Sequence, residues 1–355
     1  MESVLSTTET DTEAGKGKKT NRLGLMLDDY KGAESTLCKG CGHDAISASI
    51  MKSFYDLDVE QYRIAKLSGI GCSSKTTNYF FNGSHGFNSV HGRMSTIATG
   101  VSVANRTLLN IGVSGDGDTA SIGLGNFCHM IRRNVPIIYI VENNGCYGLT
   151  KGQASATADK GSLMRGGRAI DQEAIDLCAL AIQMGCGYVA RSFSGDAKQV
   201  RALIKGAIAH QGSAVIDIIS PCVTFNDHEG STKSRAYARK FEDPLHDIDF
   251  IPRYENIEVE YDEGTMQVVK MHDGSTITLK KLNHEYDPTD QRQALDMLER
   301  VHLEGLFYTG LMYYDAQVPT IHDQINLIDT PLVHLNDGLI RPSDSVLKEI
   351  MDTFR

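Results

Sequence analysis

Short apolar runs alternate with longer amphipathic stretches between about Tyr62 and Ser220. Each run has the length and residue types of a strand buried on both faces. The stretches between them have the apolar spacing of helices, near 94–105, 119–133, 171–185 and 196–210. The predicted strands are YRIAKL, TLLNIGVS, PIIYIVEN, YVARSF and AVIDIIS.

This alternation predicts an α/β fold, a doubly wound, mostly parallel sheet built from right-handed βαβ units with helices on both faces. Ligands of such folds bind beyond the carboxyl ends of the strands. A polar connector follows, from Asn226 to Lys240. After it, IEVEY, TMQVVKM and STITLKKL predict a small antiparallel meander, and 289–304 has a helical pattern. We therefore divide the chain into a mobile tail (1–22), a ligand-binding domain (23–230) and a mixed C-terminal extension (231–355).

Composition narrows the class of protein. The chain has 355 residues, 41% of them hydrophobic, and no apolar run reaches the roughly 18 residues that a membrane helix needs. A formal net charge of −10 argues against general nucleic-acid binding. The first 22 residues lack the apolar core of a signal peptide, so we expect a cytoplasmic protein. Its eight cysteines are then more suited to metal binding or redox chemistry than to disulfides.

Polar residues follow two of the predicted strands. TLLNIGVS runs into Gly115-Asp116-Gly117-Asp118, and PIIYIVEN ends in Asn143-Asn144. Because parallel strands end at one edge of the sheet, Asp116 and Asn144 can converge there. The glycines and the helix that opens near Thr119 favour a diphosphate. The Asp116 carboxylate, the Asn144 side-chain carbonyl and the Cys146 backbone carbonyl would be oxygen ligands for a bridging Mg²⁺.

A GDG segment followed by NN a little under thirty residues later resembles the motif of thiamine-diphosphate enzymes. The resemblance implies a pyrophosphate-binding domain in which Asp116 and Asn144 hold the metal. It also implies that the segment after Asn144 lines the diphosphate and thiazolium. The implied cofactor-binding residues are Ser73, Gly115, Asp116, Gly117, Asp118, Asn144, Tyr147, Gly148, Leu149 and Thr150.

Four cysteines have positions that allow them to meet. Cys38 and Cys41 form a CxxC pair before a helix, while Cys72 and Cys222 each follow a predicted strand. Four thiolates suit either Zn²⁺ or a [4Fe–4S] cluster, and the ligand type alone does not separate the two. A nearby thiamine site favours the cluster, because an oxidisable cofactor needs a one-electron acceptor and zinc cannot be one.

Six ordered motifs over about residues 36–230 resemble the beta subunit of 2-oxoacid:ferredoxin oxidoreductases. They are CKGCGH, GIGCSSK, HGR with Ala98-Thr99-Gly100, GDGD, NNxxYGLTKGQ and the late PC. The resemblance implies that Cys38, Cys41, Cys72 and Cys222 bind one [4Fe–4S] cluster. It also implies oxidative decarboxylation of a 2-oxoacid with coenzyme A as acyl acceptor and ferredoxin as electron carrier, a reaction that can run in reverse. An alpha subunit would supply the glutamate on the pyrimidine side of the cofactor.

The same motifs contain the candidate catalytic residues. Lys75 would project from a strand end, where an ammonium could hold the substrate carboxylate. His43 and His91 lie in matching motifs, where an imidazole could bind the diphosphate, relay a proton or have a structural role. Lys151 follows the diphosphate-lining segment and could bind a distal carboxylate. In the family that these motifs resemble, the matching lysine is associated with larger oxoacids, and a chain of this length looks more like the 2-oxoglutarate branch. The resemblance therefore favours 2-oxoglutarate, which would give succinyl-CoA.

Three alternatives stay open at this point. The substrate could be pyruvate. The chain could be a thiamine-dependent decarboxylase or synthase whose cysteines bind structural zinc. It could also be a non-catalytic scaffold in which GDGD and NN are turns.

Overall fold

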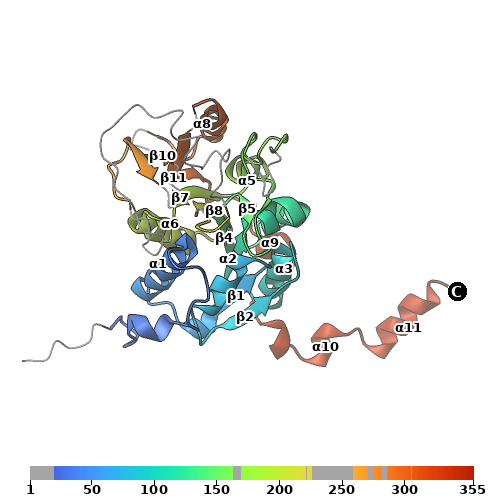
Figure 1. The fold of residues 1–355 in the computed structure, drawn as a ribbon. Helices are drawn as coiled ribbons and strands as arrows, with labels where there is room; N and C mark the ends of the chain where they lie inside the picture. The colour runs from blue at the N-terminus through green and yellow to red at the C-terminus, as the bar shows by residue number, and fades with distance from the viewer. Residues whose placement is uncertain are drawn as a thin grey trace, which may run out of the picture.

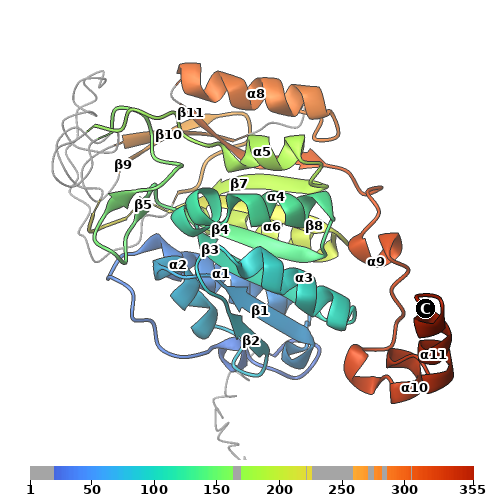
Figure 2. The same ribbon diagram turned by 90° about the vertical axis from the view of Figure 1, so that its right-hand side faces the viewer.

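The computed structural model describes residues 20–162, 169–220, 222–225, 259–270, 276–281, 286–304 and 306–355. A sheet of nine strands, in the order β2-β1-β3-β4-β8-β7-β11-β10-β9, crosses the molecule (Figures 1 and 2). Its strands are β1 Ile64–Ser68, β2 His85–Asn88, β3 Leu109–Gly115, β4 Ile137–Asn143, β7 Tyr188–Phe193, β8 Ser213–Ile219, β9 Met266–Lys270, β10 Thr276–Lys281 and β11 Leu306–Tyr314.

Six consecutive strands of this order, β2-β1-β3-β4-β8-β7, are parallel to one another, which confirms the predicted doubly wound sheet. Each of the five strands predicted from apolar runs is present, within two residues of its predicted ends. The short edge strand β2 was not predicted, because its four residues are all exposed and carry no apolar run. Buried apolar runs therefore predicted the central strands of the sheet but did not predict its edge strand.

Helices cover both faces of the sheet. They are α1 Gly42–Asp56, α2 Cys72–Lys75, α3 Met94–Ala104, α4 Leu124–Arg132, α5 Leu177–Gln183, α6 Ala197–Ala209 and α8 Gln291–Glu304. One apolar core lies under α3, α4, α5 and α8, and a second lies under α1 and α6 (Figure 2). Along β4, Tyr139 and Val141 point into the first core, while Ile138 and Ile140 point into the second.

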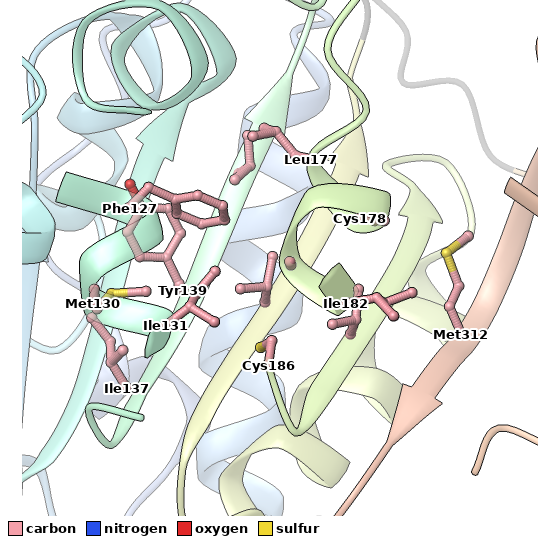
Figure 3. Close-up of a cluster of buried hydrophobic side chains, with 14 of the residues drawn as sticks. Phe127, Met130, Ile131, Ile137, Tyr139, Leu177, Cys178, Ile182, Cys186 and Met312 are labelled. Carbon is pink, nitrogen blue, oxygen red and sulfur yellow. The ribbon is translucent and has the colours of Figure 1, made fainter. Parts of the chain in front are cut away.

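Two predicted helices differ from the observed ones. The stretch 119–133 is divided into a π-helical turn, Gly117–Ile122, and α4. The stretch 171–185 becomes helical only at α5, where the Asp176 side chain accepts hydrogen bonds from the backbone N–H groups of Cys178 and Ala179. In Figure 3, Cys178 and Cys186 pack among apolar side chains of the first core. Both cysteines are fully buried core residues.

The C-terminal extension continues the main sheet. Strands β9 and β10 form the expected antiparallel pair. The extra strand β11 joins them to the sheet by pairing in parallel with β10 and antiparallel with β7. This connection was not predicted, since the run Leu306–Tyr314 resembles any buried strand and does not reveal its neighbours. Residues 259–261 of the expected first meander strand are not a strand, and 257–258 lie outside the described residues.

Most of the predicted tail, 1–19, the connector 226–240 and the 230/231 boundary also lie outside the described residues. At the other end, the chain leaves the body after α9 Ile321–Gln324 (Figure 1). It continues as an arm, residues 331–355, with the helices α10 Asp337–Ile340 and α11 Asp344–Asp352. Within the described part of the chain, no helix is long and apolar enough to cross a membrane.

Candidate functional site

The carboxyl ends of β3 and β4 bring the two predicted metal ligands into contact. These strands are parallel neighbours, with Gly115 opposite Glu142, so the residues that follow them lie side by side. The backbone N–H of Asn144 donates to Asp116 Oδ1 at 3.2 Å. The predicted convergence of Asp116 and Asn144 is therefore confirmed, although 28 residues separate them in the sequence.

Asp116 is fully buried and held by two hydroxyl groups. Its Oδ2 accepts hydrogen bonds from Ser155 and from Thr157, the latter at 2.7 Å. Burial raises the pKa of Asp116, and the two hydroxyl groups and the Asn144 N–H act in the opposite direction. Sequence reasoning missed Ser155 and Thr157, because a serine and a threonine in a loop have no distinctive spacing.

The segment after Asn144 folds back as a small hairpin, with β5 Cys146–Tyr147 paired to β6 Gln153–Ala154. The Asn144 side-chain oxygen accepts the Cys146 N–H at 3.1 Å, and the Cys146 carbonyl accepts the Gly148 N–H at 3.1 Å. Each of these oxygens has a second lone pair. Together with the Asp116 carboxylate they are hard donors, which is the donor set that Mg²⁺ requires.

Gly117 and Tyr147 fit together at this edge. The Tyr147 hydroxyl donates to the Gly117 carbonyl at 3.0 Å, and a Cβ on Gly117 would lie only 2.6 Å from the Tyr147 ring. Glycine is required here for the close approach of the ring. Asp118 has a different role, since it accepts hydrogen bonds from the Gly92 N–H at 2.8 Å and the Ser114 hydroxyl at 2.9 Å. It thereby links the segment at Gly92 to the end of β3.

A cavity at this edge is lined by twelve residues that were predicted to bind the diphosphate or Mg²⁺ or to take part in catalysis. They are Ser73, His91, Gly115, Asp116, Gly117, Asp118, Asn144, Cys146, Tyr147, Gly148, Leu149 and Thr150. The lining also includes Cys72, one of the predicted cluster ligands. The structure thus places the predicted cofactor residues around one space and a cluster cysteine in its wall.

The predicted cluster cysteines gather beside this cavity. A Cβ at Gly148 would lie 3.6 Å from Cys72 Sγ and 3.7 Å from Cys222 Sγ. Cys38 is exposed, and its sulfur accepts a hydrogen bond from the Thr224 hydroxyl at 3.4 Å. Cys41 is buried at the start of α1 and close enough to Cys222 for the two charges to interact. All four residues therefore lie around the same corner of the sheet.

The charge environment of these thiols differs from one to the next. Burial raises the pKa of Cys41 and of Cys72. Hydrogen bonds, chiefly from Cys146, lower the pKa of Cys222 to about 6. Among the described residues, no three acidic, histidine or cysteine side chains lie close enough to hold a single metal ion.

His43 lies beneath the site, outside the cavity lining. Its Nδ1 is 2.8 Å from the Ser220 hydroxyl and 3.6 Å from Glu142 Oε2. Burial lowers the pKa of His43 to about 4 and raises that of Glu142 well above its usual value. Burial therefore disfavours the charged form of both groups. Sequence reasoning missed Glu142, because a glutamate at the end of a strand is usually exposed.

Of the other three candidate residues, His91 lines the cavity, and Lys75 and Lys151 are not among the residues that line it. His91 is exposed. Lys75 is half-buried at the end of α2, where its charge lowers the pKa of Cys72 against a larger raising effect of burial. Lys151 is exposed, and its φ of +79° is unusual for a residue with a side chain. The backbone of Lys151 is held by a hydrogen bond from its N–H to the Gly148 carbonyl at 3.2 Å.

Comparison with known proteins adds independent information. The family model for thiamine pyrophosphate enzymes, C-terminal TPP binding domain, matches residues 69–218. In Saccharolobus solfataricus, the 2-oxoacid:ferredoxin oxidoreductase subunit beta is 35% identical over 262 residues, which cover 72% of this chain and 85% of the relative. Subunit beta of 2-oxoacid:ferredoxin oxidoreductase 1 from Aeropyrum pernix is 42% identical over 195 residues, which cover 54% of this chain and 60% of that subunit.

A solved structure is similar over nearly the whole chain. It is the 2-oxoglutarate:ferredoxin oxidoreductase from Magnetococcus marinus, with 2-oxoglutarate, coenzyme A and succinyl-CoA bound. The TM-score is 0.71 at 27% sequence identity, and the match covers 94% of this chain and 97% of that one. This match therefore includes most of the C-terminal extension. The match to the Aeropyrum subunit covers only 54% of this chain.

Proposed function

The chain belongs to the beta subunits of the 2-oxoacid:ferredoxin oxidoreductases, and from this we propose that it carries the thiamine diphosphate, Mg²⁺ and [4Fe–4S] sites of such an enzyme. The reaction proposed is 2-oxoglutarate, coenzyme A and oxidised ferredoxin to succinyl-CoA, CO₂ and reduced ferredoxin. The observation that carries the proposal is at Gly148. This residue lies in the predicted diphosphate-lining segment and packs against the sulfurs of Cys72 and Cys222.

The residues present fit the two cofactor groups. Asp116, Asn144 and the Cys146 carbonyl would hold Mg²⁺, and Cys38, Cys41, Cys72 and Cys222 would hold the cluster. When bound, thiamine diphosphate supplies a nucleophilic carbon for the 2-oxo group and the cluster supplies a one-electron acceptor. The chain itself orients the diphosphate through Gly117 and Tyr147. It also excludes water from Asp116 by burial.

An alpha subunit is proposed as the partner that completes the site. The word beta in the relatives' names implies such a partner. Beside the cavity, Val90 is 71% exposed and Leu149 is 51% exposed. Apolar side chains of this size favour a protein surface over water. Contact with another subunit there would also enclose the pyrimidine half of the cofactor, whose glutamate the family resemblance assigns to the alpha subunit.

The 2-oxoglutarate assignment rests on Lys151. The side chain follows the diphosphate-lining segment, where a cation could receive the distal carboxylate of a dicarboxylic substrate. The Magnetococcus structure, with 2-oxoglutarate bound, supports this choice. A cytoplasmic location is proposed on the eight cysteines, all of which have free thiols.

The decisive experiment is anaerobic purification with the partner subunit, followed by assays for iron, sulfide, thiamine diphosphate and oxoacid-dependent reduction of a viologen dye. We expect iron and sulfide in equal amounts, bound cofactor, and turnover only when both subunits are present. A colourless protein with zinc would contradict the redox proposal, and turnover by this chain alone would contradict the need for a partner.

The substrate is tested with Lys151→Ala, using Lys198→Ala as a control because Lys198 is an exposed lysine on α6. Lys151→Ala should raise KM for 2-oxoglutarate and change kcat/KM for pyruvate little. The loss corresponds to a charge-assisted hydrogen bond, about 1.5–3 kcal/mol. Equal losses for both substrates would move Lys151 to a cofactor role, and a wild-type preference for pyruvate would replace the 2-oxoglutarate assignment.

A further inference from the structure

Two of the predicted cluster thiolates accept hydrogen bonds from side chains. The Thr224 hydroxyl donates to Cys38 Sγ at 3.4 Å. The Cys146 side chain forms a hydrogen bond with Cys222, in which Cys146 is the donor once Cys222 is a thiolate, and the backbone N–H groups of Thr224 and Phe225 donate to the same sulfur. Neither Cys146 nor Thr224 is one of the four predicted ligands. Both nevertheless contact ligand sulfurs directly.

The surroundings make these hydrogen bonds effective. Cys146 is only 8% exposed, and Cys222 is half-buried against Gly148. Little water is therefore available to replace a lost donor on the Cys222 side. Cys38 is exposed, so its hydrogen bond from Thr224 competes with water. The hydrogen bond from Cys146 should accordingly have the larger effect.

The physical consequence concerns the charge of the cluster. A hydrogen bond to a thiolate stabilises negative charge, and a cluster that has gained one electron is more negative than the oxidised cluster. Donors to the ligand sulfurs therefore stabilise the reduced state more than the oxidised state. Hydrogen bonds to the sulfurs are among the factors that set the reduction potentials of iron–sulfur clusters.

We propose that Cys146 and Thr224 are positioning residues that raise the reduction potential of the cluster by donating side-chain hydrogen bonds to Cys222 and Cys38. The inference rests on the proposed function, since it requires that the four cysteines bind a cluster. It leaves the backbone role of Cys146 untouched, because its carbonyl is present whatever the side chain. The two residues thus adjust how readily the centre accepts an electron.

The test is a redox titration of the cluster in the anaerobic holoenzyme, followed by electron paramagnetic resonance. The variants are Cys146→Ala and Thr224→Val, which remove the donors, and Cys146→Ser and Thr224→Ser, which keep a hydroxyl. At the same poised potential, Cys146→Ala should lower the ratio of reduced to oxidised cluster at least threefold, which is about 28 mV for a one-electron couple. Thr224→Val should shift it in the same direction by less, and both serine variants should stay near wild type.

The control is Cys128→Ala, which removes a half-buried thiol on α4, remote from the four ligands in the sequence and outside the cavity lining. Its potential should equal that of the wild type. Unchanged potentials in Cys146→Ala and Thr224→Val overturn the inference, as does loss of iron in Cys146→Ala, which would make Cys146 a ligand. If the wild-type holoenzyme contains no iron, the proposed function fails before this test begins, so the two failures are distinguishable.

Discussion

The cofactor edge of the sheet and the C-terminal arm differ in which side chains they bury and which they expose. At the cofactor edge, polar groups such as Asp116 are buried and satisfied by Ser155 and Thr157. In the arm, apolar side chains are exposed, with Phe354 at 83% and Val333 at 82%. Contacts within this chain organise the polar groups of the first region, whereas the second leaves apolar side chains exposed in the described structure.

The arm has local order without support from the body. Asn336 and Ser343 cap its two helices through side-chain hydrogen bonds to Leu339 N and Val346 N. In the described structure, the hydrogen bonds and ion pairs of residues 331–355 all stay within that segment. A helix as short as α11 is marginal in water by itself, so contact with another surface would stabilise it. The contrast predicts that substitutions in the two regions will affect different properties.

The largest effect on this chain is expected from Cys222→Ser. The substitution replaces one thiolate of four, so one iron would lose its preferred ligand and cluster content should fall strongly. Iron, sulfide and the visible spectrum measure the outcome. If all three stay at wild-type levels, Cys222 is not a ligand. The contrast between the two regions would then lose one of the residues on which it rests.

A smaller and more selective loss is expected from Asp116→Ala and from Asn144→Ala. Each removes an oxygen donor, and affinity for thiamine diphosphate with Mg²⁺ should fall on the order of 10–100-fold. The cluster should be retained, because neither residue is one of its predicted ligands. Asp337→Ala, an exposed aspartate of the arm, is the matched control. Wild-type cofactor affinity in both cavity variants, measured by calorimetry, would refute the diphosphate site.

The same contrast explains how much the sequence could predict. Asp116, Asn144 and the four cysteines follow strands or start helices, and strand ends in a parallel sheet meet at one edge, so their assembly was predictable. Ser155, Thr157 and Glu142 were not found, because their roles depend on tertiary contacts that no local spacing reveals. The pairing of β11 with β7 was not predicted for the same reason. Local patterns locate elements, and only the fold decides which of them are neighbours.

Gly117→Ala probes the packing of the cofactor edge. The added Cβ would meet the Tyr147 ring at 2.6 Å, so the ring or the π-helical turn must shift, at a cost of about 1–3 kcal/mol. Gly125→Ala is the control, since nothing lies within 4 Å of a Cβ at that position. Thermal unfolding of the holoenzyme should separate the two variants. Equal stability would mean that Tyr147 is free to move and that this edge is less rigid than its hydrogen bonds indicate.

The smallest effect on the chain's own folding is expected from removing the arm. A chain that ends at Asn326 would also lose the link of Arg106 to the Leu327 carbonyl and to Asp329, so the truncation should begin at Pro331 and keep both contacts. Because residues 331–355 have no hydrogen bond or ion pair to the rest of the described chain, unfolding free energy should change by less than about 0.5 kcal/mol.

Association with the alpha subunit should weaken in the truncated chain, since the apolar stripe Val346, Leu347, Ile350, Met351 and Phe354 is removed from the partner's reach. Ile350→Asp should reproduce part of this loss, and Glu349→Ala, on the polar side of α11, should not. Size-exclusion chromatography of the two subunits measures association, and denaturant unfolding measures stability. A truncated chain that unfolds much more easily would show that the arm packs on its own body in solution. In that case the arm, like the cofactor edge, would be stabilised by contacts within this chain, and the contrast between the two regions would not hold.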